Sequence, residues 1–139
     1  GFLIDEQGKE KGQGGYNAIR VYLWAGLLHA DAPGRKALLA ALTPMARYVR
    51  DQGYPPEFID ILSAQASGPA HSGFSAALLP FLRAAGDDKA LQAQRARLEA
   101  RPLRPTAYYE QVLALFGLGA FEGQYRFTAT GHLIARWKP

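Results

Sequence analysis

Apolar residues recur at helical spacing along most of the chain. Between residues 16 and 30, Ile19, Leu23 and Leu27 follow the i, i+4 spacing that places side chains on one face of a helix. The same periodicity predicts a second amphipathic helix over residues 35–52. The stretch DAPG at 31–34 separates the two, because Pro and Gly interrupt helical structure. The chain therefore begins, after a polar stretch, with a pair of helices.

The remaining pattern predicts further helices and one hairpin. Pro56 is a typical first residue for a short helix that reaches Leu62. Further helices are expected over 73–85, over 88–101 with Asp87 or Asp88 as its cap, and from a Thr106 cap through Leu118. The first 15 residues predict a strand-like stub and a loop, and the alternating tail around Thr130–Gly131 predicts a β-hairpin.

About six helices in series predict an all-α fold in one domain, residues 1–139, with a short C-terminal β-hairpin. Paired helices of this kind fit a bundle, a solenoid or an α/α barrel. With 48% hydrophobic residues, a chain of this length can bury a core. The periodicity alone does not choose among the three architectures.

Composition excludes several classes of protein. The chain has no cysteine, which excludes a disulfide scaffold, a thiolate metal site and a Cys nucleophile. No apolar run approaches the ~20 residues of a membrane-spanning helix, so we expect no membrane insertion. The net charge is +4, but the Lys and Arg residues are scattered, which argues against nucleic acid as a partner.

The sequence indicates no metal and no cofactor. His29, His71 and His132 have no ligating partner at i+3 or i+4, the spacing that brings two ligands onto one helix face. The glycine-rich stretches GQGG and GLGAFEG lack the strand context of a dinucleotide loop and the lysine of a P-loop. Both are better explained as turns.

One segment, GGYNAIRVYLWAG at 14–26, combines polar and aromatic groups at the start of a predicted helix. Asn17 and Arg20 are three residues apart and therefore share a helix face, with Tyr16 beside them. In one interpretation Asn17 caps the helix and Arg20 pairs with an acidic residue. In the other, the three residues form a polar site with an aromatic ring that stacks on a sugar.

Three stretches resemble glycoside hydrolase family 8. They are GGYNAIRVYLWAGLL (14–28), GFSAALLPFL (73–82) and YYEQVLALFGLGAFEGQYRF (108–127), and they occur in the family's order. The resemblance implies an (α/α)6 barrel and inverting endo-β-1,4-glucanase (cellulase) activity. It is strongest to the family members that accompany bacterial cellulose synthase. That implies a role in cellulose production and a periplasmic or secreted location, with the export signal outside these residues.

The resemblance also assigns the residues of the motif. In the family, the general base is an Asp at the position of Asn17, and Tyr16 and Arg20 match their counterparts, which implies that they line the substrate cleft. An amide is not a proton acceptor at working pH, so the exchange to Asn17 removes the base. We therefore also consider a second interpretation, a glucan-binding or scaffolding relative that has lost turnover.

The chain is too short for the whole barrel. Twelve helices of ~11–12 residues with connectors of ~4–6 need roughly 200 residues or more. The resemblance therefore covers about half of the barrel, its C-terminal half, without the Glu that serves the family as general acid. We expect this chain to be inactive alone. The expected partners are a β-1,4-glucan oligosaccharide, the missing N-terminal half or a second copy, and the cellulose synthase machinery.

Overall fold

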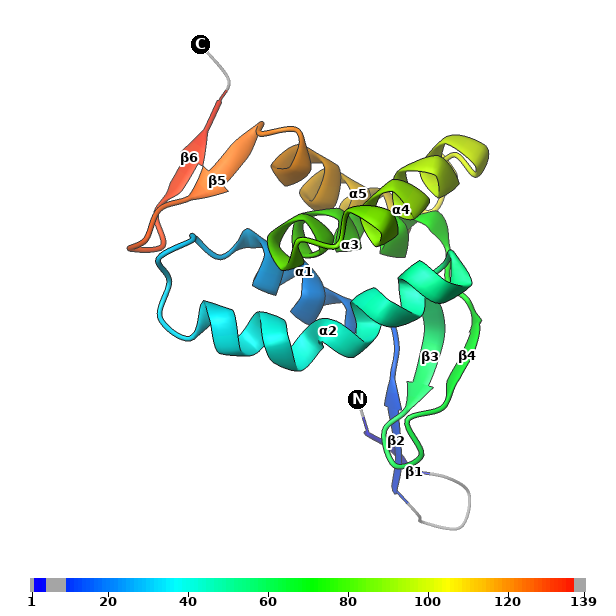
Figure 1. The fold of residues 1–139 in the computed structure, drawn as a ribbon. Helices are drawn as coiled ribbons and strands as arrows, with labels where there is room; N and C mark the ends of the chain where they lie inside the picture. Colours follow the sequence, from blue (N-terminus) through cyan, green and yellow to red (C-terminus); the bar gives the residue numbers. More distant parts are fainter. Residues whose placement is uncertain (1, 5–9, 137–139) are drawn as a thin grey trace.

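The computed structural model describes residues 2–4 and 10–136, and helices dominate this part of the chain (Figure 1). The described residues contain five α-helices: α1 (Ile19–Leu27), α2 (Arg35–Gln52), α3 (Ser72–Ala85), α4 (Asp88–Ala100) and α5 (Tyr108–Phe121). The predominantly helical fold predicted from apolar periodicity is confirmed. The bounds of α2 agree with the predicted helix at both ends.

Six short strands complete the described part of the fold. β1 (Phe2–Ile4), β2 (Glu10–Gly14), β3 (Pro56–Asp60) and β4 (Ala66–Pro69) form an antiparallel sheet in that order. β5 (Tyr125–Phe127) and β6 (Leu133–Ala135) form a separate hairpin. Figure 1 shows the sheet and the hairpin at opposite ends of the helical layer.

The strands confirm two predictions and correct two. The strand-like stub expected near the start of the chain is β1. The C-terminal hairpin is present, and its turn includes Gly131 at a φ of 82°. The short helix expected from Pro56 to Leu62 is wrong, because residues from Pro56 onward form β3, which pairs with β2 on one side and β4 on the other. The loop expected before residue 15 is in part β2. In both cases pairing between distant segments outweighs the local signal.

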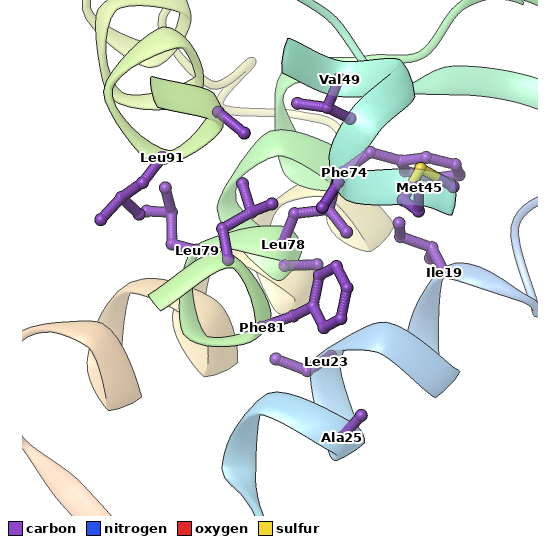
Figure 2. Packing of buried hydrophobic residues seen from close by; sticks show 14 of the residues in the cluster. Ile19, Leu23, Ala25, Met45, Val49, Phe74, Leu78, Leu79, Phe81 and Leu91 are labelled. Carbon is purple, nitrogen blue, oxygen red and sulfur yellow. The ribbon is translucent and has the colours of Figure 1, made fainter. Parts of the chain in front are cut away.

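Helix α3 is the centre of the core. Every residue from 72 to 82 is buried, and α3 packs most extensively against α5, α1 and α4. A helix that is apolar on all sides must be surrounded, and this one is. Figure 2 shows Phe74, Leu78 and Phe81 of α3 among side chains from α1 and α2, including Leu23 and Val49.

Glycines allow the helices around α3 to approach closely. A Cβ added to Gly26 of α1 would lie 2.3 Å from the backbone nitrogen of Phe81. A Cβ added to Gly117 of α5 would lie 2.1 Å from the carbonyl oxygen of Ala76. Any side chain at either position would force the two helices apart. The small residues thus set the spacing of α1 and α5 on either side of α3.

One predicted helix cap is confirmed and another is wrong. Asp87 caps α4, since its side chain accepts a hydrogen bond of 3.0 Å from the backbone nitrogen of Ala90. Thr106 does not cap α5, because that helix starts one residue later, with Ala107 at the cap position and no side-chain cap bond. Within the described residues, no helix combines the length and apolar character needed to cross a bilayer.

Candidate functional site

The N-terminal ends of α1, α3 and α5 meet at one place. Tyr16 precedes α1, His71 is the N-cap of α3 and Tyr109 lies in the first turn of α5. The ring of Tyr16 lies 5.7 Å from that of His71 and 5.7 Å from that of Tyr109, measured between centroids. Segments more than 90 residues apart in the sequence thus converge around Tyr16.

Asn17 and Arg20 are joined by a direct hydrogen bond. The Arg20 guanidinium donates to Oδ1 of Asn17 at 2.8 Å, as their i, i+3 spacing allows. Asn17 does not cap α1, because Ala18 occupies the cap position and makes no side-chain cap bond. The interpretation of Asn17 as a cap is therefore wrong. The partner of Arg20 in this bond is an amide rather than an acid.

Tyr16 is held at both its side chain and its backbone. Its hydroxyl donates a hydrogen bond of 2.7 Å to Oε1 of Glu57, and its carbonyl oxygen accepts one from the Tyr109 hydroxyl. Its ring also packs edge-on against Phe74 at 5.5 Å. The hydrogen bond to Glu57 is the largest cause that raises the pKa of Tyr16 above its ordinary value, followed by burial and by the charge of Glu57. Tyr16 therefore stays a neutral hydrogen-bond donor at neutral pH.

Glu110 and His71 make two further interactions where the N-terminal ends of α1, α3 and α5 meet. Glu110 in the first turn of α5 is buried and accepts a hydrogen bond of 2.8 Å from Nε of Arg104. Nδ1 of His71 accepts a hydrogen bond of 3.1 Å from the backbone nitrogen of Gly73, which caps α3. Burial is the main cause that lowers the pKa of His71, so the neutral ring that can accept this bond predominates at neutral pH.

Sequence reasoning brings together Tyr16, Asn17 and Arg20 but misses Glu57, His71 and Tyr109. The three predicted residues are close in sequence, and helical spacing is enough to group them. Glu57 reaches Tyr16 through the pairing of β2 with β3, and no local pattern encodes that pairing. The one available signal is the Tyr-Tyr-Glu run at 108–110, which places aromatic and acidic groups at a helix start.

The predicted residues lie on an open surface. Tyr16 is 41% exposed, and Asn17 and Arg20 are also exposed. A pocket of about 200 Å³ lies beside them between β3 and α1, and its lining includes Ala18, Glu57 and Phe74. An exposed aromatic ring beside paired polar side chains is suited to a sugar, because the ring stacks on its apolar face and the polar groups bind its hydroxyls.

The part of the chain that the structure describes contains no cluster of three or more His, Asp or Glu residues able to hold a metal ion. The polar groups at this place are hydrogen-bonding side chains, a guanidinium and carboxylates. Asn17 can donate and accept hydrogen bonds but cannot accept a proton from water at neutral pH.

Comparison with known proteins identifies the family. Residues 6–123 match Glycosyl hydrolases family 8. The chain belongs to this family. The family 8 chain is 45% identical over 122 residues to an endoglucanase of Salmonella typhi and 45% identical over 128 residues to one of Xanthomonas axonopodis. These matches cover 88% and 90% of this chain.

The family 8 chain also has a close structural counterpart. The endo-1,4-D-glucanase of Vibrio fischeri superposes with a TM-score of 0.73 at 33% identity, and the match covers 99% of this chain. The helices of the family 8 chain described here are therefore those of an (α/α)6 barrel, in which α1, α3 and α5 are neighbours. The match covers only 40% of the Vibrio chain, and the Salmonella and Xanthomonas matches cover 32% and 33% of those proteins. This family 8 chain thus spans about a third of the length of the curated relatives that it matches.

Proposed function

We propose that residues 1–139 form the C-terminal part of an endo-β-1,4-glucanase domain and supply one wall of its glucan-binding cleft. The observation that carries this proposal is the placement of Tyr16, Asn17 and Arg20. They lie together, exposed, where the N-terminal ends of three barrel helices meet. The relatives named endoglucanases support β-1,4-glucan as the ligand.

Each residue has a distinct role in this proposal. Inverting hydrolysis uses a general acid and a general base whose carboxyl groups lie ~6.5–9.5 Å apart, with the attacking water beside the base. Asn17 occupies the position of the base, and Arg20 orients its side chain through their hydrogen bond. Tyr16 offers its ring to a glucose unit. With an amide in place of a carboxylate, the water can be bound but not deprotonated.

The described residues offer no general acid beside Tyr16. Of the carboxylates around Tyr16, Glu57 already accepts the Tyr16 hydroxyl and Glu110 is buried against Arg104. Neither is available to protonate a leaving oxygen in the open cleft. We therefore place the acid in the N-terminal part of the domain, since a second copy of this chain would carry the same residues.

Binding of cellohexaose, a β-1,4-linked glucose hexamer, tests this proposal. In isothermal titration we expect the chain to bind cellohexaose, and Tyr16→Ala and Arg20→Ala to weaken binding. Arg95→Ala is the matched control, because Arg95 is exposed on α4 and bonds only weakly to Gln92 at 3.5 Å. Equal binding by all three variants would contradict the assignment of the site.

A second function, glucan binding without turnover, is favoured by Asn17 itself. A chain that binds glucan without cleaving it would act as a scaffold on the polymer. Restoring the base with Asn17→Asp decides between the two functions.

We further propose that the protein acts outside the cytoplasm during bacterial cellulose production. A β-1,4-glucan polymer does not diffuse through a bilayer, so a glucanase must meet its substrate where the polymer emerges. The cellulose synthase machinery is then the neighbouring assembly. Fractionation of the native host tests this, with recovery in the cytoplasm as the contrary result.

A further inference from the structure

We propose that Glu57 is a positioning residue that fixes the Tyr16 ring for stacking on a glucan unit. The inference rests on the proposed function, and it adds a residue to the site from outside the helical motif. Glu57 is on β3, 41 residues from Tyr16 in the sequence, and its carboxylate accepts the Tyr16 hydroxyl at 2.7 Å.

The sheet brings these two residues together. β2 pairs antiparallel with β3 so that Gln13 lies opposite Asp60 and Gly14 opposite Ile59. β2 ends at Gly14, two residues before Tyr16, and Glu57 lies two residues before Ile59 on β3, so this pairing brings Tyr16 and Glu57 to the same end of the strand pair. From there the Tyr16 hydroxyl reaches the Glu57 carboxylate at 2.7 Å. The tyrosine before α1 is therefore held by the sheet as well as by the helices.

Among the described residues, the other contacts of Tyr16 involve its ring or its backbone. Glu57 therefore orients the phenol hydroxyl. The Tyr109 hydroxyl holds the backbone carbonyl of Tyr16, and the Tyr109 ring lies 5.7 Å from the Tyr16 ring between centroids. Phe58, His71 and Phe74 also contact the ring, at centroid distances of 5.5 to 6.1 Å, and these ring contacts are less directional than a hydrogen bond. The bond to Glu57 is therefore the directional restraint on the hydroxyl end of a residue that is 41% exposed.

A fixed ring binds a sugar better than a mobile one. An aromatic platform that rotates must lose conformational entropy when the ligand stacks on it. A carboxylate that holds the hydroxyl removes this loss before binding. Glu57 therefore contributes to glucan affinity through Tyr16 and not by contact with the sugar.

Three variants test the inference on the 139-residue chain: Glu57→Ala, Glu57→Gln and Tyr16→Phe, with Glu99→Gln on the exposed face of α4 as the matched control. We expect Glu57→Ala and Tyr16→Phe each to weaken cellohexaose binding about two- to tenfold, as loss of one hydrogen bond would. The double variant should lose no more than the stronger single variant. Glu57→Gln should retain most of the affinity, because its amide oxygen still accepts the hydroxyl. Additive losses, or full affinity in Glu57→Ala, would overturn the inference.

A second measurement separates this inference from the proposed function. The NMR resonances of the Tyr16 ring, assigned with Tyr16→Phe, report its orientation without any ligand. In Glu57→Ala we expect them to move towards the shifts of a mobile tyrosine and in Glu57→Gln to stay, while those of Tyr125 remain unchanged in both. Absence of cellohexaose binding by the unmodified chain contradicts the proposed function alone. A Tyr16 ring unaffected by Glu57→Ala contradicts the positioning role whatever the ligand.

Discussion

Arg20 donates a hydrogen bond of 2.8 Å to the side-chain oxygen of Asn17, one helical turn earlier. The geometry suits a guanidinium and a carboxylate equally well, because both an amide and a carboxylate present an oxygen acceptor at this place. Arg20 is thus paired with an uncharged amide at the place where the function we propose calls for a carboxylate base.

The first prediction concerns the substitution Asn17→Asp. It changes the Asn17–Arg20 hydrogen bond into an ion pair and supplies a proton acceptor where the proposed mechanism needs one. General-base catalysis typically contributes ~10²–10⁴ in rate, so we expect hydrolysis to rise by that factor. The measurement needs the general acid, so the chain is joined to the N-terminal two thirds of the Salmonella relative, and reducing ends released from carboxymethylcellulose are counted.

The same fusion carrying Asn17 is the control, and it should bind cellohexaose without releasing reducing ends above background. If the Asp fusion binds glucan and still does not hydrolyse it, the scaffold function becomes the better description of this chain. If the Asn17 fusion is already as active as the Asp fusion, then Asn17 does not stand at the base position.

The second prediction concerns the close approach of α5 to α3. Gly117→Ala adds a Cβ 2.1 Å from the carbonyl oxygen of Ala76, so the helices must separate. Overpacking of this kind costs about 1–3 kcal/mol and outweighs the ~1 kcal/mol by which Ala favours a helix over Gly. Urea unfolding measures the difference. Gly119→Ala on the same helix is the control, since its nearest new neighbour is a Tyr125 ring carbon at 3.2 Å that can shift, and a similar loss there would exclude the steric cause.

Local periodicity is sufficient to predict most of this fold. The helix at 35–52 and the C-terminal hairpin depend on contacts between near neighbours in the chain, and both are predicted. β3 is missed because Pro56 is an equally good first residue for a helix, and only its pairing with β2 and β4 makes the segment a strand. The same limit applies to the site. Tyr16 is found from its motif, and Glu57 is not, because a sheet register joins them.

The third prediction concerns stability below neutral pH. Burial lowers the pKa of His71 in the folded chain, so below the ordinary histidine pKa the unfolded state binds more protons than the folded one. The contribution of His71 to the free energy of unfolding is therefore fully present above pH ~6.5, and it declines as the pH falls towards the pKa of His71 in the folded chain. Protonation at Nδ1 would also remove the acceptor for the Gly73 backbone nitrogen.

Thermal unfolding between pH 7 and pH 5 measures this effect. Because the ring is partly exposed, we expect the loss attributable to His71 to stay well below ~1.4 kcal/mol per pH unit. His71→Asn should lose less stability over this range, since Asn caps a helix without titrating. His132→Gln is the control on the exposed hairpin and should behave as the unmodified chain does. Identical pH profiles for the unmodified chain and His71→Asn would contradict the prediction.

The fourth prediction concerns the apolar face shared by α1 and α5. Trp24 is 48% exposed and packs edge-on against Phe116 at 6.0 Å, and Leu115, which precedes Phe116 in α5, is 71% exposed. Apolar patches of this kind favour association, and the matched relatives are about three times as long as this chain. We expect sedimentation velocity to show that the isolated chain self-associates as its concentration rises.

Trp24→Ser with Leu115→Ser should reduce association. Leu62→Ser, which removes an exposed leucine from the loop between β3 and β4, should not. If the chain stays monomeric over a wide concentration range and unfolds cooperatively, the prediction that this apolar face drives association is wrong.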